Sequence, residues 1–588
     1  MKWELAQVPE RAQVEAVARA CGVESPLIAA IVARRLAGQS PEAYLAPAEA
    51  SLSPPEDLPE MDRAVERICR AIAQGEPISV FGDYDADGIT GTTLLVKALK
   101  AAGAASVQPF FPDREREGYG LTVEALTRCL ARHKPSPTLL ITVDCGITCA
   151  AEVAWLAERK VEVVVTDHHT LPEGLPQAVA VVNPQRLPEG HPARGMCGCA
   201  TAFTLVRALE AAGLPIHAED YLDLVAVATI ADVMALTGDN RTLVARGLAL
   251  LASGRGNPGL AELLRALRAP KAVGFPTAEE VAFGIIPCVN AAGRVGSQLL
   301  EYYRQGGAFR GLYDFESRLS PLHRVYRLLA DGEAGRAFAK DLMALNRLRK
   351  QAESELHKLL AGCTPKPGEQ VMIVPCPELY AGVAGIVAAR LMGRVGVPVA
   401  VVCQDSAGNA HGSMRSCGSW HAVEALRAVE DLLANYGGHA KAAGFVLKPG
   451  AYADFCRRLP QAFAGGDATE SATYEADLTG ESALYGDLCR ELKRLEPMGH
   501  GNPKPIFRAT FRVESARIIG KTRDHLALQL APVPAGEALK AVWFGHGPEV
   551  DRWAPGTEAQ FYFTVSEDTF YTTPRPSLMI VEAEASSC

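Results

Sequence analysis

Short hydrophobic runs that end in acidic residues recur through the first half of the chain. Three of them, Ile78–Phe81, Leu139–Val143 and Val161–Thr166, are strand-like. Stretches of helix-like composition, such as Ala150–Arg159, separate these runs. Strands that alternate with helices predict a doubly wound parallel sheet, so the expected fold class is α/β.

Acidic residues cluster where these strands are expected to end. Asp83, Asp85 and Asp87 fall within five residues, directly after the first strand. Alternate residues of an extended segment share a face, so their oxygens can converge on one cation, and Mg²⁺ or Mn²⁺ prefers such ligands. An isolated Asp-x-Asp is more often a solvated turn, so this interpretation depends on matching residues downstream.

Matching residues follow the later hydrophobic runs: Asp144, the triplet Asp167, His168 and His169, and Asp232 after the apolar run Leu222–Ala231. Ligands of a parallel sheet gather at the carboxyl ends of its strands, where all four motifs are expected to lie. Several carboxylates with one imidazole suit a two-metal phosphoesterase site, in which each ion keeps positions open for water and phosphate.

The carboxyl-terminal half predicts two further domains. Val371–Pro375 and Val397–Cys403 are strand-like and Gly385–Met392 is an apolar helix, which indicates a smaller α/β domain. Five strand-like runs separated by Gly, Pro and charged turns then predict an OB-type β-barrel. These runs are Phe507–Ile519, His525–Leu530, Leu539–Phe544, Glu558–Val565 and Ser577–Glu582.

A long amphipathic helix is expected between the two lobes, near Arg324–Lys358. Its apolar residues are three and four positions apart, at Leu342, Leu345, Ala352, Leu356 and Leu359. The many basic residues of this connector are interpreted as a solvated face.

Composition excludes several classes of protein. At 588 residues and 48% hydrophobic, the chain can form three or four domains with substantial cores. Its start lacks the apolar segment of a signal peptide and no charge-free run has the length of a membrane span, so a cytoplasmic protein without membrane contact is expected. Fifteen cysteines in a chain of this length are too few to indicate a disulfide-rich protein. For the closest pair, Cys197 and Cys199, reduced thiols are a better interpretation than a metal site.

The net charge of −9 argues against a generally basic nucleic-acid binder, so any DNA contact must come from local patches. Arg490–Arg523 holds nine Lys or Arg and three Glu, together with Phe507 and Phe511. OB surfaces combine basic grooves with aromatic platforms that stack on bases. Lys504 and Arg508 are therefore predicted nucleic-acid contacts.

The acidic motifs resemble those of the DHH phosphoesterase superfamily. The motifs are Asp-Tyr-Asp-Ala-Asp-Gly (83–88), Val-Asp-Cys-Gly (143–146), Thr-Asp-His-His (166–169) and Thr-Ile-Ala-Asp (229–232). Further motifs, including Tyr436–Gly444 and Glu496–Pro503, make the chain similar over nearly its whole length to the RecJ family of bacterial 5′→3′ single-strand-specific exonucleases.

The resemblance implies a domain plan and a function. Residues 1–60 would be a helical lead-in, 61–315 the parallel-sheet DHH catalytic domain, 316–360 the connector, 361–465 the DHHA1 domain and 466–588 an OB-fold-like nucleic-acid-binding domain. The implied activity is metal-dependent degradation of single-stranded DNA in repair and recombination, by a monomer that works with a helicase and a single-strand-binding protein.

Two other functions stay open at this point. A DHH phosphodiesterase or pyrophosphatase for small substrates would share the metal site, although the OB-like domain and the basic patch speak against it. A non-catalytic replication scaffold of the same plan would be expected to have lost metal ligands, and none is lost here.

The residues and the resemblance together imply a site for two Mn²⁺ or Mg²⁺ ions, with the ligands Asp83, Asp85, Asp87, Asp144, His168 and Asp232. Asp144 is expected to bridge the ions, and Asp83 is either a ligand or a hydrogen-bond acceptor behind the ligands. Asp167 is expected to orient His168 or its neighbour His169 by a hydrogen bond, and His169 to contact phosphate.

The second lobe is expected to hold the phosphate. Arg415 would neutralise the scissile group, with Arg294 of the first lobe facing it across a cleft. His439 would touch a phosphate or the leaving oxygen, and the flexible Gly437 and Gly438 would allow close approach.

Three features depart from the family pattern. Leu379 and Tyr380 stand where a Trp-His pair is usual, and Cys288 stands where an Arg is typical. The segment 296–321, with Tyr302, Tyr303 and Tyr313, is also longer than usual. None of these is a metal position, so we expect altered affinity or strand placement rather than lost chemistry.

Overall fold

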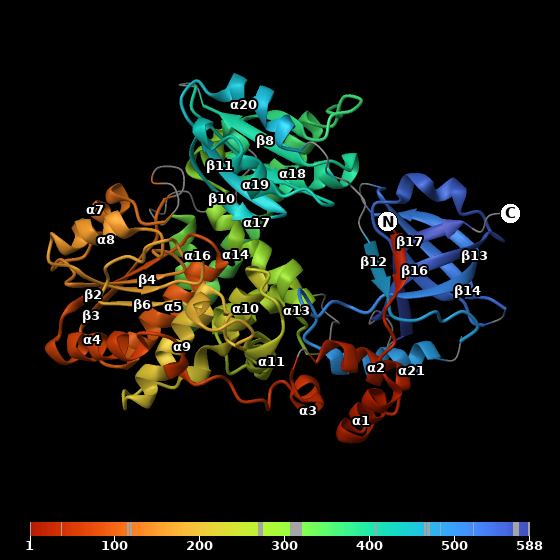
Figure 1. Cartoon of the computed structure of the whole chain (residues 1–588), viewed down its shortest axis with the longest axis horizontal. Coiled ribbons are helices and arrows are strands. Elements are labelled where there is room, and N and C mark those ends of the chain that lie inside the picture. Colours follow the sequence, from red (N-terminus) through yellow and green to blue (C-terminus); the bar gives the residue numbers. More distant parts are fainter. Residues whose placement is uncertain are drawn as a thin grey trace. The chain divides into compact units, whose positions relative to one another are not determined.

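Five parallel strands form the sheet that the hydrophobic runs predict (Figure 1). Their spatial order is β3 (Ser106–Phe110), β2 (Pro77–Gly82), β4 (Leu139–Val143), β5 (Glu162–Thr166) and β6 (Ala180–Val182). From β2 the chain adds β3 on one side, and β4 to β6 on the other, so the order reverses between β2 and β4. The loops at such a switch point diverge and leave room for a ligand.

Helices cover both faces of this sheet. One face carries α7 (Val123–Arg132) and α8 (Ala150–Ala157), and the other α4 (Met61–Gln74), α5 (Ala86–Ala101) and α9 (Gly198–Ala211). Strands buried on both faces are hydrophobic throughout, which explains why the sequence shows continuous apolar runs here instead of alternation.

The fourth hydrophobic run is a helix, so the expectation that Asp232 ends a strand is wrong. Leu222–Ala231 forms α10, which packs against α5, α9 and α11 (Gly238–Ser253) and is buried from Leu222 to Thr229. A helix buried on all sides is hydrophobic all round and lacks the three-and-four pattern, so periodicity alone does not distinguish it from a strand.

This structure is a computed structural model that describes residues 2–36, 38–113, 117, 120–268, 275–305, 320–405, 408–463, 466, 471–481, 484–520, 523–534, 536–568 and 575–585. Tyr313 and the rest of 306–319, in the long segment noted above, lie outside them. Packing divides the chain into two compact units. One consists mainly of Pro287–Ala472, and the other of Trp3–Pro112, Glu117–Ile286 and Thr473–Cys588.

The unit Pro287–Ala472 contains the predicted smaller α/β domain. Its sheet has the order β10, β11, β9, β8, β7, in which only β7 and β8 are parallel. The strands are β7 (Met372–Pro377), β8 (Val399–Gln404), β9 (Ala410–Arg415), β10 (Leu433–His439) and β11 (Ala442–Leu447), with α18 (Ala381–Val395), α19 (Ala422–Arg427) and α20 (Tyr452–Arg458). Arg415 therefore lies on β9, and Gly437, Gly438 and His439 lie on β10, with β11 between the two strands.

The connector is two helices where one long helix was expected. α16 (Pro321–Ala330) and α17 (Ala339–Leu359) flank a 3-10 segment, and Gly332 there has a φ of +56°. Leu342, Leu345, Ala352 and Leu356 are buried, as their spacing predicts, but Leu359 in the last turn is 59% exposed.

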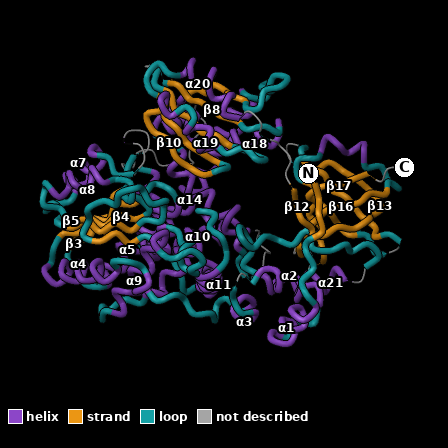
Figure 2. Tube along the Cα trace, in the orientation of Figure 1, coloured by secondary structure: helices purple, strands orange, loops and turns teal. Residues whose placement is uncertain are grey.

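The predicted OB-type barrel is confirmed as a closed sheet of five strands (Figure 2). They are β13 (Phe507–Ile519), β14 (His525–Pro532), β15 (Leu539–Trp543), β16 (Glu558–Asp568) and β17 (Arg575–Ala585). The barrel shares one hydrophobic core with α1 (Arg11–Cys21), α2 (Pro26–Arg35) and α21 (Leu484–Leu492). The amino-terminal helices thus pack on the carboxyl-terminal barrel.

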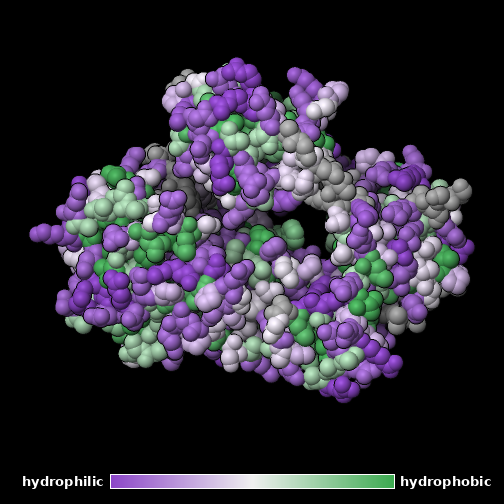
Figure 3. All heavy atoms as spheres, in the orientation of Figure 1, coloured by the Kyte–Doolittle hydropathy of each residue, from purple (hydrophilic) through white to green (hydrophobic). Residues whose placement is uncertain are grey.

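The remaining elements are short. They are β1 (Lys2–Leu5), which pairs with β12 (Ser471–Tyr474), and α3 (Pro41–Leu45), α12 (Pro258–Leu267), α13 (Ala278–Glu280), α14 (Ile286–Arg294) and α15 (Ser297–Gln305). Hydrophilic side chains cover much of the face in Figure 3, with hydrophobic ones in scattered patches. Within the described residues, no single helix has the length and hydropathy of a membrane span, although α1 and α2, bent by 102°, pass that test as a pair.

Candidate active site

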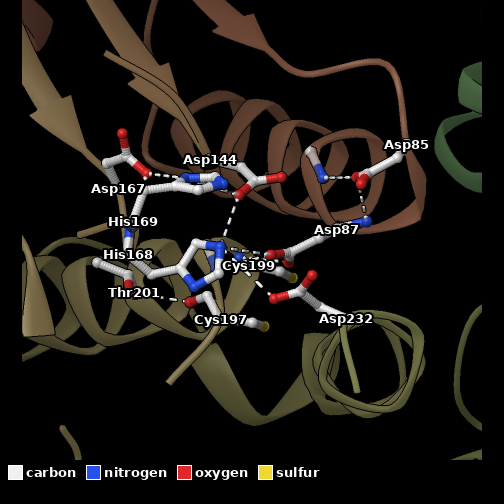
Figure 4. Close-up of polar contacts among 12 residues, drawn as sticks. Asp85, Asp87, Asp144, Asp167, His168, His169, Cys197, Cys199, Thr201 and Asp232 are labelled. Carbon is white, nitrogen blue, oxygen red and sulfur yellow. Dashed lines mark hydrogen bonds and ion pairs between the residues drawn. The ribbon is translucent and has the colours of Figure 1, made fainter. Parts of the chain in front are cut away.

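Six predicted ligands lie in overlapping groups near the carboxyl ends of β2, β4 and β5, and Figure 4 labels all of them except Asp83. Among the described residues, three groups have ligand atoms within 4.8 Å of one another: Asp83, Asp85 and Asp144; Asp87, His168 and Asp232; and Asp144, His168 and His169. Asp144 and His168 each belong to two groups. The arrangement can therefore hold more than one cation, with shared ligands between them.

The imidazole of His168 points into the middle of these carboxylates (Figure 4). Its Nε2 lies 3.0 Å from Asp144 Oδ1, 3.5 Å from Asp232 Oδ2 and 3.8 Å from Asp87 Oδ2. Asp232 reaches the site from the carboxyl end of α10, so this ligand follows a helix where the end of a strand was expected.

Backbone geometry sets the direction of the central carboxylate. Asp144 has a φ of +63°, in the left-handed region that few residues other than Gly, Asn and Asp adopt. Its N–H still donates to the carbonyl of Thr166 on β5, at 3.0 Å. The chain therefore leaves the sheet directly after β4, and a short acidic side chain is compatible with that conformation.

Two of the acids also hold helix ends. Asp85 is the N-cap of α5, where its Oδ1 accepts hydrogen bonds from Asp87 N at 3.0 Å and Gly88 N at 3.1 Å. Asp87 accepts bonds from Gly198 N at 2.7 Å and Cys199 N at 2.8 Å, at the start of α9. Each carboxylate is thus fixed by backbone N–H groups.

Burial and crowding raise the proton affinity of this site. Burial, together with the charges of Asp87, Asp85, Asp83 and Asp232, raises the pKa of Asp144 well above its ordinary value. Burial and the neighbouring carboxylates likewise raise the pKa of Asp232 to about 8.

The donor set fits a divalent cation. Asp144 Oδ1 and Asp232 Oδ2 are buried oxygens that accept no well-oriented hydrogen bond within the described residues. Such oxygens are costly to bury unless a cation or a donor satisfies them. Carboxylate oxygens with one imidazole nitrogen are suitable ligands for Mn²⁺ or Mg²⁺.

Asp167 orients His169, which confirms the predicted hydrogen bond to a neighbouring histidine. Asp167 Oδ1 lies 2.7 Å from His169 Nδ1 and also accepts the N–H of His168, while Oδ2 accepts the N–H of Ile147. Burial would lower the pKa of His169, but the bond and charge of Asp167 outweigh it and raise that pKa to about 9. The hydrogen bond from His169 to Asp167 thus favours the protonated form of His169, beside the ligands.

Two of the predicted phosphate contacts, Arg415 and His439, lie in line across the sheet of the unit Pro287–Ala472. Arg415 on β9 pairs with Ala442 on β11, which pairs with His439 on β10. Gly437 and Gly438 lie on the same exposed strand as His439. The register therefore brings Arg415 and His439 to the same end of the sheet, on two strands that are separated by β11.

Arg294 lies in the same compact unit as Arg415, not in the opposite lobe as expected. Burial lowers the pKa of Arg415, and the charge of Arg294 lowers it further. Burial with the charges of Arg294 and Arg390 lowers the pKa of Arg349 to about 10. Four guanidinium groups thus gather in this unit.

The buried Glu353 is the counter-charge in this cluster. It pairs with Arg349 and lies 3.1 Å from Arg390. Arg349 and Glu353 were missed in the sequence analysis because the charged residues of α17 were interpreted as a solvated face. Arg390 was missed because the segment that forms α18 was interpreted only as an apolar helix.

Three residues at the positions that depart from the family pattern form hydrogen bonds within the unit Pro287–Ala472. Cys288 is buried and accepts a hydrogen bond from Asn346 Nδ2 at 3.3 Å. The hydroxyls of Tyr303 and Tyr380 both donate to Glu355, at 2.9 and 3.2 Å.

Lys504 and Arg508 are placed in ion pairs within the chain. Lys504 pairs with Glu279, and Arg508 lies 2.7 Å from Asp477. Their role in nucleic-acid binding stays a prediction.

Comparison with known proteins assigns three segments of the chain. Family models match residues 77–229 (DHH family, N-terminal domain), 368–465 (DHHA1 domain) and 479–582 (RecJ OB domain). The single-stranded-DNA-specific exonuclease RecJ of Thermus thermophilus is 40% identical over 81% of this chain and 65% of its own length. The RecJ of Salmonella typhimurium is 31% identical over 84% of both chains.

Solved structures show the same similarity. Thermus thermophilus RecJ in complex with Mn²⁺ superposes with a TM-score of 0.80 at 33% identity, covering 100% of this chain and 80% of that one. The complex of the same protein with Mg²⁺ gives a TM-score of 0.73 at 31% identity, over 100% and 79%.

Proposed function

The chain belongs to the RecJ family of single-stranded-DNA-specific exonucleases, and on this basis we propose that it degrades single-stranded DNA from the 5′ end with two Mn²⁺ or Mg²⁺ ions. The observation that carries the proposal is that all six predicted ligands fall into groups of close ligand atoms, which Asp144 and His168 join to one another. The chain spans 65% of the length of its Thermus relative, so the activity of the whole relative is part of this proposal.

Bound divalent ions would supply an activated water and neutralise charge on the phosphodiester. The residues of this chain supply the ligands for these ions. Asp144, shared between two ligand groups, is the proposed bridge, and Asp232 and His168 complete one of the positions. Asp83 is a further ligand or accepts a hydrogen bond behind them.

His169 is the proposed phosphate contact of the metal-binding unit. Asp167 keeps it protonated and fixes its ring, so a positive N–H can meet a phosphate oxygen. Arg415, Arg294 and His439 are the proposed phosphate contacts of the other unit, where a guanidinium can bind two oxygens at once.

The outer face of the barrel is the proposed surface for the rest of the strand. Leu526, Leu528 and Leu530 of β14 point into the core, so their neighbours face outward. The outward residues on and beside β13–β15 include Arg512, Arg517, His525, Gln529, Lys540 and Phe544. Phe544 is 55% exposed beside the ring of His525, and Glu514 is the one acid on these three strands. Basic groups around an exposed aromatic ring suit single strands of any sequence.

The same observations bear on the alternatives. A non-catalytic scaffold is disfavoured because every predicted metal ligand is present and clustered. An enzyme for small substrates is disfavoured because such a substrate would not reach the basic and aromatic side chains on the outer face of the barrel. The proposal includes a cytoplasmic monomer whose partners are a helicase and a single-strand-binding protein.

One assay tests the proposal directly. Single-stranded and duplex DNA, labelled at the 5′ or the 3′ end, would be incubated with the protein in Mg²⁺, Mn²⁺ or EDTA. We expect early release of labelled mononucleotide from 5′-labelled single strands with either ion and none in EDTA. Activity in EDTA, equal digestion of duplex, or earlier release of the 3′ label would overturn it.

A further inference from the structure

The segment Cys197–Cys199 lies against the metal-binding carboxylates, although neither cysteine was expected to act there (Figure 4). Gly198 N donates to Asp87 Oδ2 at 2.7 Å, and Cys199 N donates to Asp87 Oδ1 at 2.8 Å. Both oxygens of one carboxylate are thus bound by the first two N–H groups of α9. The first N–H groups of a helix have no partner within it and favour negative charge.

Gly198 also lies against Asp144, the carboxylate that the two ions would share. A Cβ at this position would lie 2.5 Å from Asp144 Cβ, and 2.8 Å from both its Cα and its Oδ1. Asp144 Cα, and with it Cβ, has little freedom to move away, because the backbone N–H of Asp144 is bonded to Thr166 of β5. The requirement for glycine here is therefore one of space.

The thiols on either side do not explain the contact. Cys197 and Cys199 are buried, and no group of clustered ligand atoms within the described residues includes a cysteine. Cys197 Sγ lies 3.7 Å from the hydroxyl of Thr229, on α10.

We propose that Gly198 is a positioning residue for the metal centre. It lets the start of α9 bind both oxygens of Asp87 while Asp144 packs against the same turn. The separation of the two carboxylates, and the directions of the lone pairs left for cations, are set by this contact. The inference rests on the proposed two-metal site, and it adds the residue that fixes the positions of two ligands, Asp87 and Asp144, relative to each other.

The test substitutes Gly198 and a matched glycine three residues earlier. A Cβ at Gly195 would meet only Asn240 Nδ2, at an ordinary 3.6 Å, so Gly195→Ala is the control. Mn²⁺ binding to metal-free protein would be followed by calorimetry. We expect Gly198→Ala to weaken Mn²⁺ affinity by about tenfold or more, as the loss of other groups that orient metal ligands does.

A purely structural role predicts a different pattern. If Gly198 positions the ligands, the lost nuclease activity of Gly198→Ala should return in part at high Mn²⁺, while Gly195→Ala behaves as the parent. Parental Mn²⁺ affinity in a folded Gly198→Ala protein would overturn the proposal.

A second measurement decides the question if Gly198→Ala fails to fold. In metal-free protein, replacing a carboxylate of this crowded site relieves repulsion, so Asp232→Asn should raise the melting temperature. Asp87→Asn should instead lower it by a few degrees, because the amide NH₂ cannot accept the N–H groups of α9. A rise in both variants would exclude the anchoring of Asp87 to α9. Melting needs no nuclease activity, so this result stands even if the proposed function fails.

Discussion

Arg241 Nη1 donates a hydrogen bond of 2.9 Å to the carbonyl oxygen of Pro497. Arg241 belongs to α11, is 1% exposed, and donates to the carbonyls of Tyr44, Leu495 and Glu496 as well, each at 3.0 Å. One guanidinium therefore joins the helices around the metal site to the amino-terminal helices and to the segment that leads into the barrel.

We expect Arg241→Ala to destabilise the protein strongly. The substitution removes four hydrogen bonds to backbone carbonyls, although those of Leu495 and Pro497 keep a bond from Asn502 Nδ2. Losing a partner from such a buried charged network costs about 3 kcal/mol or more. Thermal unfolding would measure the effect, with Arg19→Ala on the exposed face of α1 as the control. Equal melting temperatures for the two variants would contradict the prediction.

The metal-free protein should lose stability as the pH rises. Asp232 has a pKa of about 8 in the folded chain against about 3.8 when unfolded, so the folded state binds more protons between these values. Stability therefore falls with increasing pH across this window. We expect a lower melting temperature at pH 8 than at pH 6 in EDTA, and a much smaller difference in saturating Mn²⁺. An unchanged or rising melting temperature in EDTA would show that the carboxylates are not crowded.

Asp144→Ala should abolish hydrolysis while the fold and DNA binding persist. Its position in two ligand groups means that its loss weakens both proposed cation positions. Nuclease assays in Mn²⁺ and melting curves would be compared with the parent. Near-parental turnover would show that the ligand assignment is wrong.

Arg415→Ala should slow turnover by roughly a hundredfold, because a lost charge contact in the transition state typically costs a few kcal/mol. Arg415→Lys should recover only part of this, since an ammonium meets one oxygen where a guanidinium meets two. Mn²⁺ titration should be unchanged in both variants. If turnover also matches the parent, Arg415 does not contact the phosphate.

Phe544→Ala combined with Arg517→Ala should weaken binding of long single strands and spare hydrolysis of very short oligonucleotides. Point substitutions are preferable to removing the barrel, because the barrel shares its core with α1 and α2. Filter binding would be compared with Arg19→Ala. Equal losses on short and long substrates would indicate a structural effect.

The sequence by itself determined the parts of the protein that depend on local pattern. Runs such as Leu139–Val143 and the five strands of the barrel were predicted closely, because burial on one or both faces sets the spacing of apolar residues along a strand. The acidic motifs that end these runs predicted which carboxylates would lie together, since the carboxyl ends of parallel strands meet at one edge of the sheet.

Only the tertiary structure decided the features that depend on contacts between distant segments. Asp232 ends a helix because α10 is surrounded by other helices, and full burial removes the amphipathic pattern that would have revealed it. Gly198 matters because α9 packs against Asp87, 111 positions earlier in the chain. Arg294 joins Arg415, and α1 joins the barrel, for the same reason. The local sequence pattern indicates how deeply a residue is buried. Which distant residue it contacts depends on how the helices and strands pack together.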